Sequence, residues 1–167
     1  MRDARLAKLG EGPWKGLYSI ISIIGLVLIV YGYGAARMEP IVLYAPPSWL
    51  RHPAFVLMLF VFPLVLATHF PGRIRSKLKH PMIISVKIWA FAHLLANGNL
   101  ADVLLFGAIL AWAVADLISV KRRASRPVPG FVAASWNDAI VVIGGLGLYV
   151  AFIIWLHPML IGMALVG

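Results

Sequence analysis

Five histidines are the residues of this sequence best suited to hold a metal or cofactor, because it contains no cysteine. The missing cysteine excludes disulfides, iron–sulfur clusters, covalently attached haem, zinc thiolate sites and a cysteine nucleophile. Among the histidines, His93 has the most informative neighbours. Trp89 lies four residues before it and Asn97 four residues after it, so all three share one face of a helix. Trp89 can stack on a flat ligand, and Ala90 leaves room for one, which predicts a cofactor site with His93 as metal ligand.

Asp102 and His157 are the other polar residues predicted to lie near His93. A hairpin turning at Gly98 brings Asp102 to the depth of His93, where it can orient a ring N–H of a metal-bound histidine. His157 ends a later apolar segment on the same side and is the best partner if two imidazoles clamp one cofactor. Spacing alone supports a structural role equally well, in which His93 hydrogen-bonds Asn97 or Asp102 and holds the hairpin together.

Long uncharged segments carry these residues. The chain is 62% hydrophobic and only 13% charged, whereas an ordinary soluble domain is roughly 45–50% apolar and about 25% charged. A helix needs about 20 apolar residues to cross a bilayer. We therefore predict an all-α, polytopic membrane protein, a single domain over residues 1–167, with five transmembrane helices at about 16–36, 53–71, 81–97, 99–120 and 137–157. Pro63 predicts a kink in the second helix, and Asn97-Gly98-Asn99 predicts a tight hairpin of the third and fourth.

The basic residues predict how these helices are oriented. The net charge is +9, from 15 Lys and Arg against 6 Asp and Glu. With five helices, one side of the membrane receives the N-terminal segment and the second and fourth loops, which carry four cations each. The positive-inside rule then puts the N-terminus in the cytoplasm and the C-terminus outside. The same loops can contact anionic lipid. No DNA-binding motif accompanies them, so we expect the bilayer and no nucleic acid as partner.

A resemblance to a known family rests on the pattern H-P…W-x-x-x-H-x-x-x-N-G. It is formed by Lys79-His80-Pro81-Met82, the run from Trp89 to Gly98, and Leu104-Leu105-Phe106-Gly107. With the opening segment from Gly10 to Ser19, these residues resemble the NnrU family of membrane proteins over essentially the whole chain. That family is associated with denitrification gene clusters. It is related to the zeta-carotene isomerases of plants and cyanobacteria, which carry haem b and isomerise a cis double bond of a polyene.

The resemblance implies His93 as an axial ligand of haem b, because it matches the isomerase histidine of the W-x-x-x-H motif. Ala90 stands where the isomerases have a cysteine proposed as an alternative ligand. We also expect the chain to lack the family's first helix, which carries their other histidine ligand in a motif close to H-S-x-x-x-R. The second ligand would then be His157, or the iron would be five-coordinate.

The function that the resemblance implies is redox or isomerase chemistry on an apolar, polyene-like substrate, or support of nitrogen-oxide (denitrification) metabolism. The expected location is the bacterial inner membrane. One alternative is a non-catalytic accessory subunit of a larger membrane complex, which fits the sparse catalytic polarity. Another is an S-adenosylmethionine-dependent methyltransferase of the isoprenylcysteine carboxyl type, which Lys79-His80-Pro81 resembles. Lys121-Arg122-Arg123 replace the acidic residues of those enzymes and provide no anionic clamp for a cationic methyl donor.

Overall fold

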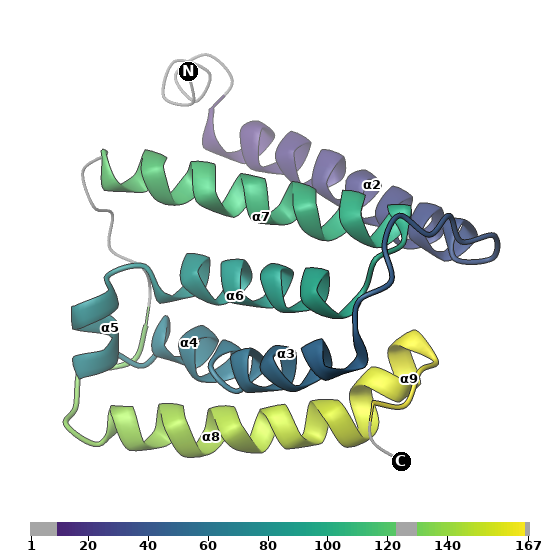
Figure 1. Cartoon of the computed structure of the whole chain (residues 1–167). Coiled ribbons are helices and arrows are strands. Elements are labelled where there is room, and N and C mark those ends of the chain that lie inside the picture. The colour runs from purple at the N-terminus through teal and green to yellow at the C-terminus, as the bar shows by residue number, and fades with distance from the viewer. Residues whose placement is uncertain (1–9, 123–129, 166–167) are drawn as a thin grey trace. The chain divides into compact units, whose positions relative to one another are not determined.

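The computed structural model describes residues 10–122 and 130–165 (Figure 1). Within these ranges the regular elements are helices, together with one isolated antiparallel bridge between Val42 and Asn99. The predicted basic lead-in with Arg2, Arg5 and Lys8, and the loop cations Arg123 and Arg126, lie outside the described residues. The chain divides into two compact units, Met1–Ile41 and Val42–Gly167, which are described separately.

The first unit contains one long helix, α2 (Glu11–Ala36). Its residues from Gly12 onward are long and apolar enough to cross a membrane. The large apolar side chains along it are exposed, including Ile20, Leu26 and Val30. Such an all-round apolar surface is typical of a helix that contacts lipid.

The second unit is a set of helices that pack in a fixed order. Its elements are η1 (Ser48–Leu50), α3 (Arg51–Met58), α4 (Val61–Ala67), α5 (Arg73–Leu78), α6 (Pro81–Ala96), α7 (Leu100–Lys121), α8 (Asn137–Ala151), η2 (Phe152–Leu156) and α9 (His157–Ile161). The helix α7 packs against α6, α6 against α3 and α4, and α4 against α8 (Figure 1). The described helices thus place α6 between α7 on one side and the α3–α4 segment on the other.

Within the described part of the chain, four helical segments are long and apolar enough to span a membrane, and they run over residues 12–36, 48–67, 100–121 and 137–161. The second of them begins and ends earlier than the predicted range 53–71. The predicted third span is the shorter helix α6, with 16 residues. At 1.5 Å per residue it is about 24 Å long, which is less than the hydrocarbon core of about 30 Å.

Prolines account for the irregular points in two of these segments. The residues Leu59 and Phe60 separate α3 from α4 just before Pro63, which has no N–H to donate to the carbonyl of Leu59. Similarly, Pro158 cannot bond the carbonyl of Ile154. The turn before it is a π-helix, in which the N–H of His157 bonds the carbonyl of Phe152.

Two contacts join α8 to the broken segment. A Cβ atom at Gly145 would lie 2.5 Å from the backbone nitrogen of Pro63, so only glycine allows this close approach. Further along α8, the hydroxyl of Tyr149 donates to the carbonyl of Phe55 at 3.0 Å. Gly147 faces open space instead. Gly145 therefore allows the close approach of α8 to the broken segment, and Gly147 does not take part in it.

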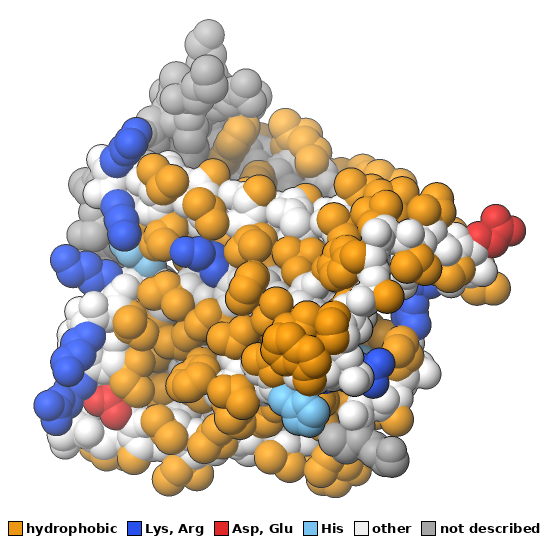
Figure 2. All heavy atoms as spheres, in the orientation of Figure 1, with side chains coloured by type: hydrophobic (Ala, Val, Ile, Leu, Met, Phe, Trp, Pro, Cys, Tyr) orange, Lys and Arg blue, Asp and Glu red, His pale blue; other side chains and the backbone are white. Residues whose placement is uncertain are grey.

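The two ends of the second unit differ in charge. At one end, residues 71–80, which include α5, lie around one pocket with the end of α7 and the residues before and at the start of α8. Lys and Arg side chains line this edge in Figure 2. At the other end residues 42–44 lie against the turn between α6 and α7. Hydrophobic side chains cover the surface between the ends (Figure 2).

Candidate functional site

The His93 side chain is held by its own helix. Its Nδ1 atom lies 2.8 Å from the carbonyl oxygen of Trp89, one turn earlier in α6. A carbonyl oxygen can only accept, so Nδ1 carries the proton and donates it. In the neutral ring the lone pair then belongs to Nε2. The helix thus presents His93 in the tautomer that a metal ion binds through Nε2.

Aromatic rings surround this imidazole. The Phe106 ring stacks on His93 with a centroid separation of 4.5 Å and an interplanar angle of 27°. Trp89 is tilted against His93 at 4.8 Å and meets Phe106 edge-on at 5.1 Å. Phe106 is 6% exposed and Ala90 is completely buried, so the space beside Ala90 is taken by packed protein. Trp89 thus contacts the ring of His93, while its stacking on a ligand stays a prediction, and the hairpin partner α7 supplies a third ring.

Asp102 and His157 both lie within electrostatic range of the His93 imidazole. Asp102 is 4% exposed and sits in the first turn of α7, where a carboxylate also interacts favourably with the helix dipole. The Nδ1 atom of His157 lies 3.1 Å from the carbonyl oxygen of Met163. By the argument given for His93, His157 too keeps its lone pair on Nε2. Two imidazoles of the same tautomer and one carboxylate are therefore gathered at this end of the unit.

Asn97 hydrogen-bonds the backbone of His93 and not its ring. Its Nδ2 donates to the backbone carbonyl of His93 at 2.9 Å, and its own backbone N–H bonds the same oxygen. These bonds end α6 and lead the chain into the turn. The hairpin is therefore held by Asn97 acting on the backbone of His93, while the ring of His93 bonds Trp89.

Tyr44 closes the turn from outside the hairpin. Its hydroxyl lies within hydrogen-bonding distance of the carbonyl oxygens of Leu94 and Asn97, the latter at 2.7 Å. The backbone N–H groups of Leu43 and Tyr44 donate to the carbonyl of Gly98 at 2.9 and 3.1 Å. A Cβ atom at Gly98 would collide with the carbonyl of Tyr44, so the turn requires glycine for close approach.

Phe106 and Tyr44 were not predicted as site residues. Phe106 lies four residues after Asp102 and so shares its helical face, which is a signal that the sequence does contain. For Tyr44 the sequence contains no comparable signal. It stands in a connecting segment 50 residues before Leu94, and only the fold brings the two together.

The donor atoms at this site can be compared with what a metal centre requires. Among the described residues no group of three or more His, Asp or Glu side chains converges as a metal-ion site. A planar macrocycle supplies its own equatorial ligands, so one or two imidazoles suffice for it. His93, whose lone pair lies on Nε2, meets that smaller requirement, and His157 lies within electrostatic range of it.

Comparison with known proteins gives one result. A family model described as NnrU protein matches residues 1–165. Searches of curated proteins and of solved structures found no match. The family match covers almost the entire sequence and includes both the hairpin and the segments that pack on it. This helical, membrane-type chain belongs to the NnrU family.

Proposed function

We propose that this NnrU-family protein binds haem b, with His93 as an axial ligand and His157 as the candidate second ligand. The observation that carries the proposal is the bond from Nδ1 of His93 to the carbonyl of Trp89. It fixes the ring and directs the Nε2 lone pair away from the backbone. A metal-bound histidine usually makes such a hydrogen bond through the ring nitrogen that does not bind the metal, which here is Nδ1.

The surrounding residues support this assignment. Trp89 and Phe106 cover the imidazole with apolar surface and limit the access of water. The carboxylate of Asp102 lies within electrostatic range of the His93 imidazole. A low-dielectric, partly closed environment of this kind is one of the means by which proteins set the potential of a metal centre.

The chemistry that haem b would supply here is one-electron redox change or electronic activation of a bound double bond. The apolar surface of the helices suits a substrate that reaches the site from the bilayer, such as a polyene. Support of nitrogen-oxide metabolism in a bacterial inner membrane is the other role that the family resemblance implies. In either case the role of the protein is to hold, orient and shield the reacting centre.

The methyltransferase alternative is disfavoured by the surroundings of Lys79-His80-Pro81. Arg73, Arg75 and Lys121 lie around the same pocket as Lys79. The carboxylate of Asp138 there already accepts two backbone N–H bonds. A cationic methyl donor would be repelled by this set of charges.

An absorption spectrum tests the proposal. We expect the full chain, purified in a neutral detergent from haem-replete cells, to show a Soret band that shifts on reduction with dithionite. The band should be lost in His93→Ala and retained in the control His52→Ala. The control removes an exposed histidine whose Nδ1 atom lies 3.2 Å from the carbonyl oxygen of Trp49.

Circular dichroism of both variants separates loss of the cofactor from loss of the fold. If the wild-type protein has no Soret band, or if a folded His93→Ala variant keeps an unchanged spectrum, the proposal is wrong. The variant His157→Ala should change the band position while leaving haem bound through His93.

A further inference from the structure

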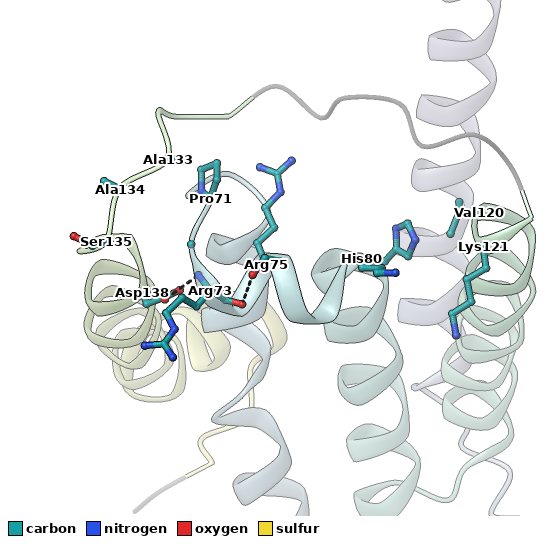
Figure 3. Close-up of a pocket in the computed structure, with 13 residues that line it drawn as sticks. Pro71, Arg73, Arg75, His80, Val120, Lys121, Ala133, Ala134, Ser135 and Asp138 are labelled. Atoms are coloured by element: carbon teal, nitrogen blue, oxygen red, sulfur yellow. Dashed lines mark hydrogen bonds between the residues drawn. The ribbon is translucent and has the colours of Figure 1, made fainter.

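An open pocket of about 1000 Å³ lies at the basic end of the second unit, far along the helices from the hairpin turn (Figure 3). Three segments distant in the sequence line it: residues 71–80, the end of α7, and residues 133–138 before and at the start of α8. Its polar lining is mainly cationic, with four Lys and Arg side chains against one carboxylate, and includes Arg73, Arg75, Ser76, Lys79, His80, Lys121, Ser135 and Asp138.

The walls of this pocket are fixed by buried polar contacts. Asn137, which is 3% exposed, donates through Nδ2 to the carbonyls of Pro71 at 2.8 Å and Val132 at 3.0 Å. The rings of Phe70 and Phe131 stack at 4.4 Å on the same side. These contacts hold the segments around Pro71 and Val132, which flank the pocket lining, against the start of α8.

The acidic group in the pocket is already engaged. The carboxylate of Asp138 accepts the backbone N–H groups of Arg73 at 2.9 Å and Ile74 at 3.1 Å, so it caps α5 (Figure 3). A side chain at Gly72 would collide with this carboxylate. Asp138 is therefore oriented toward α5, and the four Lys and Arg side chains of the lining outnumber this one carboxylate, so the site carries net positive charge.

The backbone at Lys79 adds a second observation. Lys79 has φ of 59°, in the left-handed region that a residue with a side chain seldom adopts. Holding a lysine there costs of order 1 kcal/mol, and such strain is found preferentially at binding sites and clamps. Here it ends α5 and keeps Lys79 in the pocket lining next to His80.

We propose that this pocket binds a phosphate-bearing anion, supplied by the headgroup of an anionic phospholipid or by a soluble phosphate compound. Arginine and lysine side chains are the groups that proteins use most to hold phosphate. The pocket lies at the ends of apolar helices: the exposed Leu78 precedes the lining residue Lys79, and the exposed Ile118 lies two residues before the lining residue Val120. This surface suits acyl chains below a bound headgroup and favours the lipid as the source.

Two matched double variants test the site. Lys79→Gln/Lys121→Gln removes two cations of the lining, whereas Lys77→Gln/Arg122→Gln removes two neighbouring cations that do not line the pocket. Both lower the net charge by the same amount. Full-chain protein in a neutral detergent is titrated with short-chain phosphatidylglycerol, phosphatidylcholine of equal chain length, and pyrophosphate, and bound molecules are counted by native mass spectrometry.

We expect one tightly bound phosphate-bearing molecule per chain, and affinity about 30-fold weaker in the Lys79→Gln/Lys121→Gln variant. The control variant should change affinity less than about threefold. Retention of phosphatidylglycerol over both other ligands identifies the lipid as the source, and preferential binding of pyrophosphate identifies a soluble one. Equal weakening in both variants, or no saturable binding of either anion, would overturn the proposal.

Discussion

Tyr44 ties a connecting segment to the helical hairpin through one hydroxyl group. The last carbonyls of a helix lack partners within it, and Tyr44 donates to the carbonyls at the end of α6 while Asn97 completes the turn. Burial, and then the negative charge of Asp102, raise the pKa of the Tyr44 hydroxyl above its ordinary value of 10.0. The hydroxyl therefore stays protonated, and able to donate, over the physiological range of pH.

Replacing Tyr44 by phenylalanine should lower the stability of the hairpin end in a pH-dependent way. A raised folded-state pKa contributes stability that is present below pH 10 and is lost as the pH rises through the folded value. We expect wild type to unfold at a higher temperature than Tyr44→Phe at pH 7–9, with the difference shrinking above pH 10. Thermal unfolding in detergent, monitored by circular dichroism over this pH range, measures the difference in unfolding temperature. A difference that is constant up to pH 11 would contradict this account.

The close crossing of α4 and α8 depends on the contact between Gly145 of α8 and Pro63 of α4. Pro63 breaks the hydrogen-bond ladder of its segment, and Gly145 lets α8 approach that point within backbone contact. Gly145 is buried and the nearby Tyr149 hydroxyl fixes the register of α8 against α3. Small residues allow this close packing between apolar helices, where no hydrophobic effect drives association within lipid.

A methyl group at Gly145 should force the two helices apart. Its Cβ would lie 2.5 Å from the nitrogen and 2.6 Å from the Cα of Pro63, which are backbone atoms that cannot rotate away. We expect Gly145→Ala to lower the free energy of unfolding by about 1–3 kcal/mol.

The matched control is Gly147→Ala, two residues along α8 with nothing within 4 Å. There alanine should be neutral or stabilising by up to about 1 kcal/mol, because it is the better helix former. Denaturant titration in detergent compares the two variants. Equal effects would show that the crossing does not depend on Gly145.

On the scale of the whole molecule, the described part of the second unit has a basic end and a hairpin end. The cations of the second loop meet Lys121 at one end, and residues 42–44 meet the hairpin turn at the other. We propose that the basic end faces the cytoplasm, since cations are retained on that side during insertion. The candidate haem site and the phosphate pocket would then lie at opposite faces of the membrane.

Cysteine labelling tests this orientation cleanly because the chain contains no cysteine of its own. The exposed residues Ser48 and Ser76 lie before α3 and within α5. We expect Ser48→Cys to react with a membrane-impermeant maleimide in intact cells, and Ser76→Cys to react only after permeabilisation. The reverse pattern, or labelling of both in intact cells, would overturn the proposed orientation.

The sequence by itself determined the helical, membrane-type character of the chain, the break near Pro63, the hairpin region and the pairing of Trp89 with His93. These features follow from composition, helix-breaking residues and spacing within one helix, which are local properties. It predicted the bounds of α6 to within one residue, but α6 is shorter than the helices that are long enough to span a membrane.

Only the tertiary structure decided which distant groups meet. It stacked Phe106 on His93, brought His157 within electrostatic range, placed Tyr44 at the end of α6, and set Asp138 as the cap of α5. Apart from the Phe106 contact, which spans 13 residues, these contacts join segments more than 50 residues apart, and side-chain spacing along one helix carries no information about them. The basic loops show the same division, since their charge is evident in the sequence, whereas the pocket that Arg75 and Lys121 share exists only in the folded chain.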